Sequence, residues 1–84
     1  MYKYELTSQA MRDLKKLNNH LQKRIITKLD FFVSSQQPLL FATKMINLDY
    51  GEYRFRVGQY RILFDLKGKM LIVHAIGHRR DIYR

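Results

Sequence analysis

Arginines gathered in two short stretches are the residues of this sequence best suited to chemistry. The first stretch is YRFRVGQYR, and the second is GHRRDIYR, which also carries a histidine and a tyrosine. A guanidinium group binds phosphate oxygens through two parallel hydrogen bonds and keeps its charge at physiological pH. The two stretches therefore predict a phosphate-binding patch with these candidate residues: Arg54, Arg56, Arg61, His78, Arg79, Arg80, Tyr83 and Arg84.

Cleavage of RNA without a metal is a reaction that such a patch would suit. It needs a base near a 2′-hydroxyl, an acid near the leaving 5′-oxygen and positive charge on the five-coordinate phosphate. The arginines supply the charge, His78 can act as acid or base near neutral pH, and Tyr83 can stack on a base or relay a proton. His78 can equally be a polar strand end, Tyr83 can pack on the domain, and His74 is predicted to be structural and half-buried.

Sites for a metal or cofactor are not predicted. The acids Asp49, Glu52, Asp65 and Asp81 are scattered and lack the close spacings of metal ligands. The sequence contains no glycine-rich phosphate loop and no Ser/His/Asp signature. Any catalysis is therefore expected to rest on side chains alone.

The spacing of apolar residues, which predicts the elements that position this patch, changes from helical to strand-like after Pro38. Residues 2–6 alternate between polar and apolar and predict a strand, after which Thr7 or the following serine can cap a helix. Apolar residues then recur at helical spacing up to position 33, interrupted by the asparagine pair that begins at Asn18, and predict a helical hairpin. The segment LLFATKMINL fits either a short helix or an extended linker.

Three β-rich runs follow and complete the predicted fold. They span residues 52–57, 60–66 and 69–77, separated by the two-residue turns Gly58-Gln59 and Lys67-Gly68. With the first strand, this three-stranded antiparallel meander forms one mixed or antiparallel sheet of about four strands, with the helices packed on one face. A chain of 84 residues supports one core, so residues 1–84 are predicted to form a single α+β domain.

Alternation along these strands separates the apolar residues from the arginines. Pairing outward from the two turns places Arg56 opposite Arg61, and Arg61 opposite His74. An Arg56–Arg61 pair costs up to about 1 kcal/mol, and each arginine alone is explained by solvation or by pairing with Glu52 or Asp65. As a group, joined by the tail, the arginines predict a concave cationic patch. The opposite face is the predicted core: Tyr53, Phe55, Val57, Tyr60, Ile62, Phe64, Leu66, Leu71, Val73 and Ala75.

Net charge points to an anionic partner inside the cell. With 16 Lys and Arg against seven Asp and Glu, the formal charge is +9, which attracts nucleic acid or an acidic protein. The chain has no cysteine, no apolar run of about 20 residues that would cross a membrane, and no signal-peptide pattern in MYKYELT. A cytoplasmic protein without membrane contact is expected.

The combination of YRFRVGQYRILF with IGHRRDIYR resembles the RelE/ParE superfamily of type II toxin–antitoxin toxins, and the whole sheet region resembles its RelE branch. The resemblance implies a β-α-α-β-β-β microbial RNase-like fold. It also implies an mRNA interferase, a ribosome-dependent endoribonuclease that cuts mRNA in the ribosomal A site by metal-independent attack of the 2′-hydroxyl. Its partner would be a cognate antitoxin with an acidic, partly disordered segment that folds on the toxin in a hetero-oligomer.

The resemblance also implies roles for individual residues. Arginine cannot act as a general base, so that role falls to Tyr83, His78 or the ribosome. Two other functions stay open: a ParE-like inhibitor of DNA gyrase with the same fold, and a non-catalytic basic module that binds an acidic peptide or structural RNA. The family's catalytic positions carry over to Arg54 and Arg56, where RelE proteins often have lysine, and to Arg61, Arg79 and Tyr83, with His78 beside them and Arg80 and Arg84 as further RNA contacts.

Overall fold

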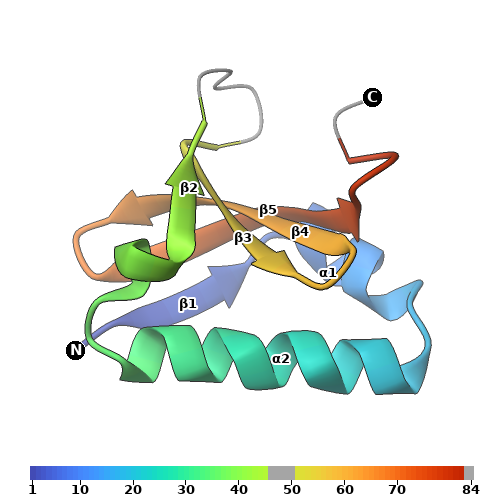
Figure 1. Ribbon diagram of the computed structural model, residues 1–84, viewed down its shortest axis with the longest axis horizontal. Coiled ribbons are helices and arrows are strands. Elements are labelled where there is room, and N and C mark those ends of the chain that lie inside the picture. The colour runs from blue at the N-terminus through green and yellow to red at the C-terminus, as the bar shows by residue number, and fades with distance from the viewer. Residues whose placement is uncertain (46–50, 83–84) are drawn as a thin grey trace.

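The computed structural model describes residues 1–45 and 51–82, and its helices lie on one face of a five-stranded sheet (Figure 1). The elements are β1 (Lys3–Leu6), α1 (Ser8–Lys15), α2 (Asn19–Ser34), a 3₁₀ turn (Pro38–Phe41), β2 (Ala42–Lys44), β3 (Tyr53–Val57), β4 (Tyr60–Lys67) and β5 (Met70–His78). The strand order is β1-β5-β4-β3-β2. No helix in the two described ranges is long and apolar enough to cross a membrane.

Side-chain caps begin both helices, at Thr7 as the sequence predicts and at Asn18 within the predicted break. The Thr7 hydroxyl accepts from the Ala10 amide at 3.2 Å at the start of α1, and the Asn18 side chain accepts from the Leu21 amide at 2.9 Å at the start of α2. Each cap satisfies a backbone N–H that has no partner within the helix. The predicted helical hairpin, with its break at Asn18, is confirmed.

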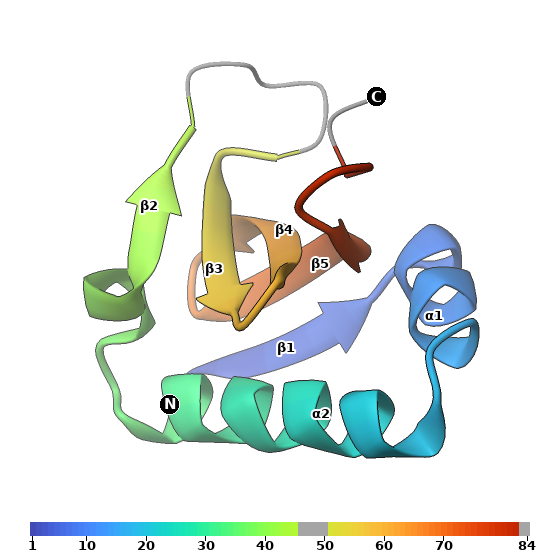
Figure 2. The ribbon, with the colours of Figure 1, turned by 45° about the vertical axis from the view of Figure 1, so that its right-hand side comes forward.

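The first strand pairs with the last one. β1 runs parallel to β5, with Lys3 opposite Met70 and Leu6 opposite Val73, as Figure 2 shows. The Thr7 amide extends this pairing by donating to the Val73 carbonyl at 3.0 Å. All other strand pairs are antiparallel, so the sheet is mixed, and the predicted α+β fold class is confirmed.

A fifth strand, β2, comes from the segment that the sequence leaves ambiguous. The 3₁₀ turn leads into Ala42–Lys44, which pairs antiparallel with β3. The expectation of about four strands is therefore one strand short. Three residues are too few to show an alternating pattern, and β2 forms because β3 offers it an edge for pairing. The last residues of the ambiguous segment, 46–48, lie outside the described residues.

The β3–β4 hairpin has the predicted register, and the β4–β5 hairpin does not. Arg56 lies opposite Arg61, as expected. The second turn comes one residue later than predicted, because Lys67 pairs with Met70 and Gly68 adopts a φ of 59° at the first turn position. Glycine reaches this left-handed conformation without the steric cost that other residues incur.

A β-bulge at His74 changes the register along β5. Phe64 pairs with Val73 and Leu63 pairs with Ala75, so His74 has no direct partner on β4. The extra residue shifts the remainder of β5 by one position relative to β4. The later turn already makes the predicted β4–β5 pairs wrong before the bulge, and the bulge shifts the pairs beyond it by one further position.

Two of the corrected pairs involve residues of the predicted site. Arg61 lies opposite Gly77, not opposite His74, and Tyr60 lies opposite His78. Because opposed residues share a face, Gly77 belongs to the same side of the sheet as Arg61, and His78 belongs to the other side.

The side chain of Asp13 in α1 holds the bulge in place. Its Oδ2 accepts from the Ile76 amide at 3.0 Å, on the edge of β5 beyond the end of β1. The Thr7 hydroxyl donates to the His74 carbonyl at 3.2 Å. Backbone groups that a longer β1 would have bonded therefore find partners in α1 and its cap.

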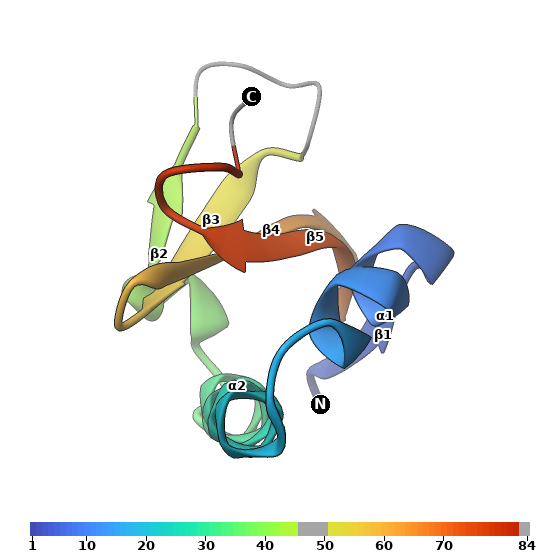
Figure 3. The ribbon, with the colours of Figure 1, turned by 90° about the vertical axis from the view of Figure 1, so that its right-hand side faces the viewer.

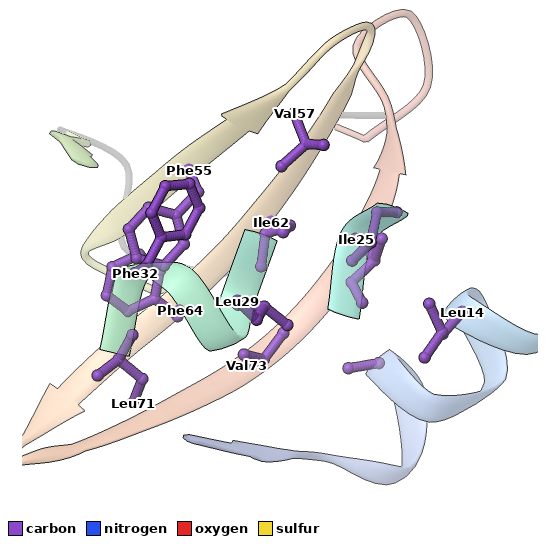
Figure 4. Packing of buried hydrophobic residues seen from close by; sticks show 12 residues of the cluster. Leu14, Ile25, Leu29, Phe32, Phe55, Val57, Ile62, Phe64, Leu71 and Val73 are labelled. Carbon is purple, nitrogen blue, oxygen red and sulfur yellow. The ribbon is translucent and has the colours of Figure 1, made fainter. Parts of the chain in front are cut away.

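The core lies between the helices and the sheet face that they cover, and aromatic rings form part of its centre (Figure 4). Phe32 of α2 stacks on Phe55 at a centroid distance of 4.1 Å, and Phe55 stacks on Phe64 at 4.3 Å. Both sheet rings are fully buried, which contributes roughly 1.5–3 kcal/mol for each ring. The predicted core face is confirmed except at Ala75, whose place Ile76 takes because of the bulge.

Candidate nucleic-acid interface

The sheet face opposite the helices, called the outer face below, carries the arginines predicted from the sequence. Side chains alternate between the two faces of a strand, so the neighbours of these arginines in β3 and β4 point into the core. The outer face includes these described residues: Thr43 of β2, Arg54 and Arg56 of β3, Arg61, Leu63 and Asp65 of β4, and Ile72, His74, Ala75 and Gly77 of β5.

Three arginines form a row near the β3–β4 turn, called the arginine row below. The Arg61 Nη1 atom donates to the Gly58 carbonyl at 3.2 Å and to the Tyr60 carbonyl at 3.1 Å. Arg56, directly opposite Arg61, is exposed, and Arg54, two residues earlier on β3, is half-buried. Because the guanidinium of Arg61 is already held by backbone carbonyls, less side-chain entropy is lost when it meets a phosphate.

The tail after β5 folds back onto the outer face, on the side of the sheet away from α2 (Figure 3). The Ile82 amide donates to the His78 carbonyl at 3.0 Å, which closes a turn. The Ile82 side chain lies over Gly77, because a Cβ at Gly77 would come within 2.8 Å of Ile82 Cδ1. Gly77 is opposite Arg61, so the tail reaches the arginine row.

The tail also brings two further arginines towards this end of the sheet. Arg79 and Arg80 are exposed within the turn. The Arg79 amide donates to the Gln59 carbonyl at 2.8 Å, which ties the tail to the β3–β4 turn. Tyr83 and Arg84, which the sequence also predicts as site residues, lie outside the described residues.

His78 is not brought to the outer face. Its ring lies edge-on to that of Tyr60, with centroids 5.4 Å apart and an interplanar angle of 80°, and Tyr60 packs against the core. The His78 Nδ1 atom accepts from the Arg80 amide at 3.2 Å, so the neutral ring carries its proton on Nε2. The structure therefore places the His78 ring on the opposite side of the sheet from Arg61.

A carboxylate and a histidine pair on the outer face where the sequence predicts a lone structural histidine. Asp65 Oδ2 lies 2.8 Å from His74 Nε2, and Asp65 Oδ1 accepts from the Glu52 amide at 2.8 Å. Gly51 adopts a φ of 116°, and a Cβ there would lie 2.9 Å from the Phe64 carbonyl oxygen and 3.3 Å from His74 Cδ2. The later β4–β5 turn and the bulge together move His74 away from Arg61 and bring it to Asp65, and no local sequence pattern signals that change.

A pocket of about 380 Å³ opens beside His74, between α1, β5 and the tail. Gln9 and Asp13 line it from α1, residues 74–77 line it from β5, and Asp81 and Ile82 line it from the tail. Within residues 1–45 and 51–82, no three histidine or acidic side chains gather as a metal site would require.

A separate apolar surface lies at the other edge of the sheet. Phe31 at the end of α2 and Leu40 in the 3₁₀ turn are 51% and 74% exposed, and Phe31 stacks edge-on with Phe41 at 5.4 Å. Together with Leu39 they form the apolar edge, which adjoins the edge strand β2. Exposed apolar residues that gather beside an unpaired strand edge are typical of a protein interface.

Relatives of this chain are toxins of toxin–antitoxin systems. A family model described as "ParE toxin of type II toxin-antitoxin system, parDE" matches residues 4–83. Toxin RelE3 of Methanocaldococcus jannaschii is 33% identical over 75 residues, which cover 87% of this chain and 85% of that protein.

Two solved structures contain chains with the same fold. One is the RelBE2 toxin–antitoxin complex from Mycobacterium tuberculosis, with a TM-score of 0.79 and 25% identity over 93% of this chain and 98% of that chain. The other is the RelB–RelE antitoxin–toxin complex from Methanococcus jannaschii, with a TM-score of 0.72 and 29% identity over 93% of each chain.

Proposed function

Because this chain belongs to the RelE/ParE superfamily of type II toxin–antitoxin toxins, we propose that it is an endoribonuclease that cleaves mRNA in the ribosomal A site. The observation that carries the proposal is the arginine row, which the tail joins at Gly77. The relatives named above carry RelE or RelBE names, which favours RNA cleavage over other activities of the superfamily.

In the proposed reaction, a 2′-hydroxyl attacks the neighbouring phosphorus and the bond to the 5′-oxygen breaks. The five-coordinate phosphate gains negative charge, which Arg61 and Arg79 stabilise, while Arg54 and Arg56 hold the RNA backbone on the sheet. Donors fixed in advance, as Arg61 is, contribute about 10²–10³-fold each to such reactions.

The remaining predicted residues support this reaction. Arg80 and Arg84 contact RNA through its phosphates. Tyr83 stacks on a base or transfers a proton, and His78 stacks on RNA at the end of the sheet.

A cognate antitoxin is the proposed protein partner. The two solved relatives are toxin–antitoxin complexes, and the net charge of +9 favours an acidic segment as the ligand. The apolar edge offers anchor points for the apolar side chains of such a segment. In the cytoplasm, this hetero-oligomer would keep the arginine row from the ribosome and its mRNA, by covering the row or by displacing the tail.

Primer-extension mapping of a defined mRNA, with and without programmed ribosomes, tests the proposed activity. We expect cuts that appear only with ribosomes and disappear in the Arg61→Ala, Arg79→Ala variant. A Lys15→Ala, Lys23→Ala variant loses the same two charges from exposed helix positions and should cut normally. Cuts that persist in the arginine variant would exclude the arginine row as the site.

A second candidate function is inhibition of DNA gyrase, favoured by the match to the ParE family model. It would use the same cationic surface for a protein or DNA contact and would require no RNA chemistry. Absence of cuts under both conditions, together with inhibited supercoiling, would support this function. A protein that neither cuts nor inhibits would be a non-catalytic basic module.

A further inference from the structure

We propose that His74, oriented by Asp65, accepts the proton of the attacking 2′-hydroxyl, an inference that rests on the proposed RNA cleavage. The reaction needs a base on the same face as the arginine row. Guanidinium groups cannot act as that base. His78 lies on the other face and uses its Nδ1 to accept from the Arg80 amide, whereas His74 lies on the outer face.

The contacts of His74 are those of an oriented base. Asp65 accepts the proton of Nε2 at 2.8 Å, which leaves the lone pair of the neutral ring on Nδ1. Asp65 is itself fixed by the Glu52 amide at 2.8 Å. No described residue hydrogen-bonds to His74 Nδ1. The arrangement of a carboxylate that orients an imidazole matches the base and orienting group of a hydrolase triad.

The position of the pair relative to the arginines follows from the strand register. Leu63 lies opposite both Arg54 and Ala75, and it is fully buried. Asp65 is two residues beyond Leu63 on the same face, and His74 is adjacent to Ala75. Diagonal neighbours of this kind lie about 7–8 Å apart. The pair is therefore one ladder step from Arg54, within the span of one nucleotide of RNA.

Access to the pair is open on two sides. The side chains of His74 and Asp65 are 35% and 33% exposed. Gly51 lies against the Cδ2 atom of the His74 ring, whereas Nδ1 is on the opposite edge of that ring. His74 also lines the pocket between α1, β5 and the tail, whose volume of about 380 Å³ falls within the range of small-ligand sites.

The pocket beside His74 carries two further carboxylates. They are Asp13 from α1 and Asp81 from the tail, in addition to Asp65, which pairs with His74 from β4. Asp13 is occupied on both oxygens, by the Gln9 side chain and the Ile76 amide. The bond to Asp65 orients the ring and stabilises the imidazolium that forms when the proton arrives, as a base requires during the reaction.

The step balances without a further reactant. The 2′-hydroxyl gives its proton to His74 Nδ1 and its oxygen forms a bond to phosphorus, while the bond from phosphorus to the 5′-oxygen breaks. The 5′-oxygen takes a proton from water, and the resulting hydroxide removes the proton from His74. The products are a 2′,3′-cyclic phosphate and a 5′-hydroxyl end.

Single-turnover cleavage of mRNA on programmed ribosomes, measured against pH, tests this assignment. His74→Gln should lower the rate by about 10²–10⁴-fold, as is typical for loss of a general base. It should also remove the fall in rate towards acidic pH, with ribosome binding unchanged. His20→Gln replaces an exposed histidine of α2 and should leave the rate and its pH profile as in the wild type.

Asp65→Asn is the second variant, because it keeps an oxygen for the Glu52 amide and tests the claim even where His74→Gln fails to fold. It should lower the cleavage rate and alter the fall of that rate towards acidic pH. If folded His74→Gln or Asp65→Asn cleaves at the wild-type rate with the wild-type pH profile, the assignment of His74 as the base is overturned. The proposed cleavage that depends on the arginines would not be affected by that result. A wild-type protein that makes no cuts overturns both proposals.

Discussion

Replacing Asp13 with alanine removes the acceptor that holds the β-bulge, and we expect this change to destabilise the fold. Asp13 Oδ2 accepts from the Ile76 amide at 3.0 Å in a part-buried bond, and Ile76 itself is only 3% exposed. A buried donor left without a partner costs about 1–3 kcal/mol. The other bond, from the Gln9 side chain to Oδ1, is exposed and adds little. The melting temperature should fall by about 4–8 °C for each kcal/mol lost in a domain of this size.

Urea unfolding at constant m value measures this loss directly. Asp13→Asn keeps an oxygen near the Ile76 amide and should recover most of the stability. Glu5→Gln removes the same charge from an exposed position on β1 and serves as the control. A loss below about 0.5 kcal/mol in Asp13→Ala, the range of ordinary surface changes, would refute the role given to this side chain.

Two further predictions concern the tail and the first strand. Gly77→Ala would place a methyl group 2.8 Å from Ile82 Cδ1, and we expect the tail to shift and cleavage to slow while unfolding free energy falls by no more than about 1 kcal/mol. Cleavage at the wild-type rate would show that the tail need not lie on the outer face. Burial and the bond to Asp30 raise the pKa of Tyr4, so the folded state holds this proton more tightly. The stability that this protonated hydroxyl contributes is fully present below about pH 10 and is lost as the pH rises through the folded pKa. The free energy of unfolding of Tyr4→Phe should therefore fall less steeply at alkaline pH than that of the wild type.

Local signals explain why much of the fold could be predicted. The caps at Thr7 and Asn18 are read from residues within a few positions of the helix that they begin. The β3–β4 register follows from the turn that starts at Gly58, since a two-residue turn fixes every pair beyond it. β2 was missed because a three-residue strand carries no period of its own and depends on β3 for its hydrogen bonds.

The candidate site was predictable only in part. Alternation along β3 and β4 was enough to place Arg56 and Arg61 on one face, apart from the core. The position of His74 depends on a bulge beside which Asp13, far away in the sequence, accepts from the Ile76 amide. No sequence pattern around His74 indicates that hydrogen bond. The same bulge decides that His78 lies on the opposite side of the sheet from Arg61.

The parallel pairing of β1 with β5 also sets an order on folding during synthesis. Lys3 cannot pair until Met70 has left the ribosome, and Asp13 waits still longer for the Ile76 amide. Contacts that join distant parts of a chain form late, and a chain emerges from its N-terminus first. The first strand and helix therefore wait for nearly the whole sheet, and the arginine row reaches its final geometry only when β5 arrives. An antitoxin that recognises the folded outer face can bind only after β5 has been made, because no earlier stage of synthesis offers it the same surface.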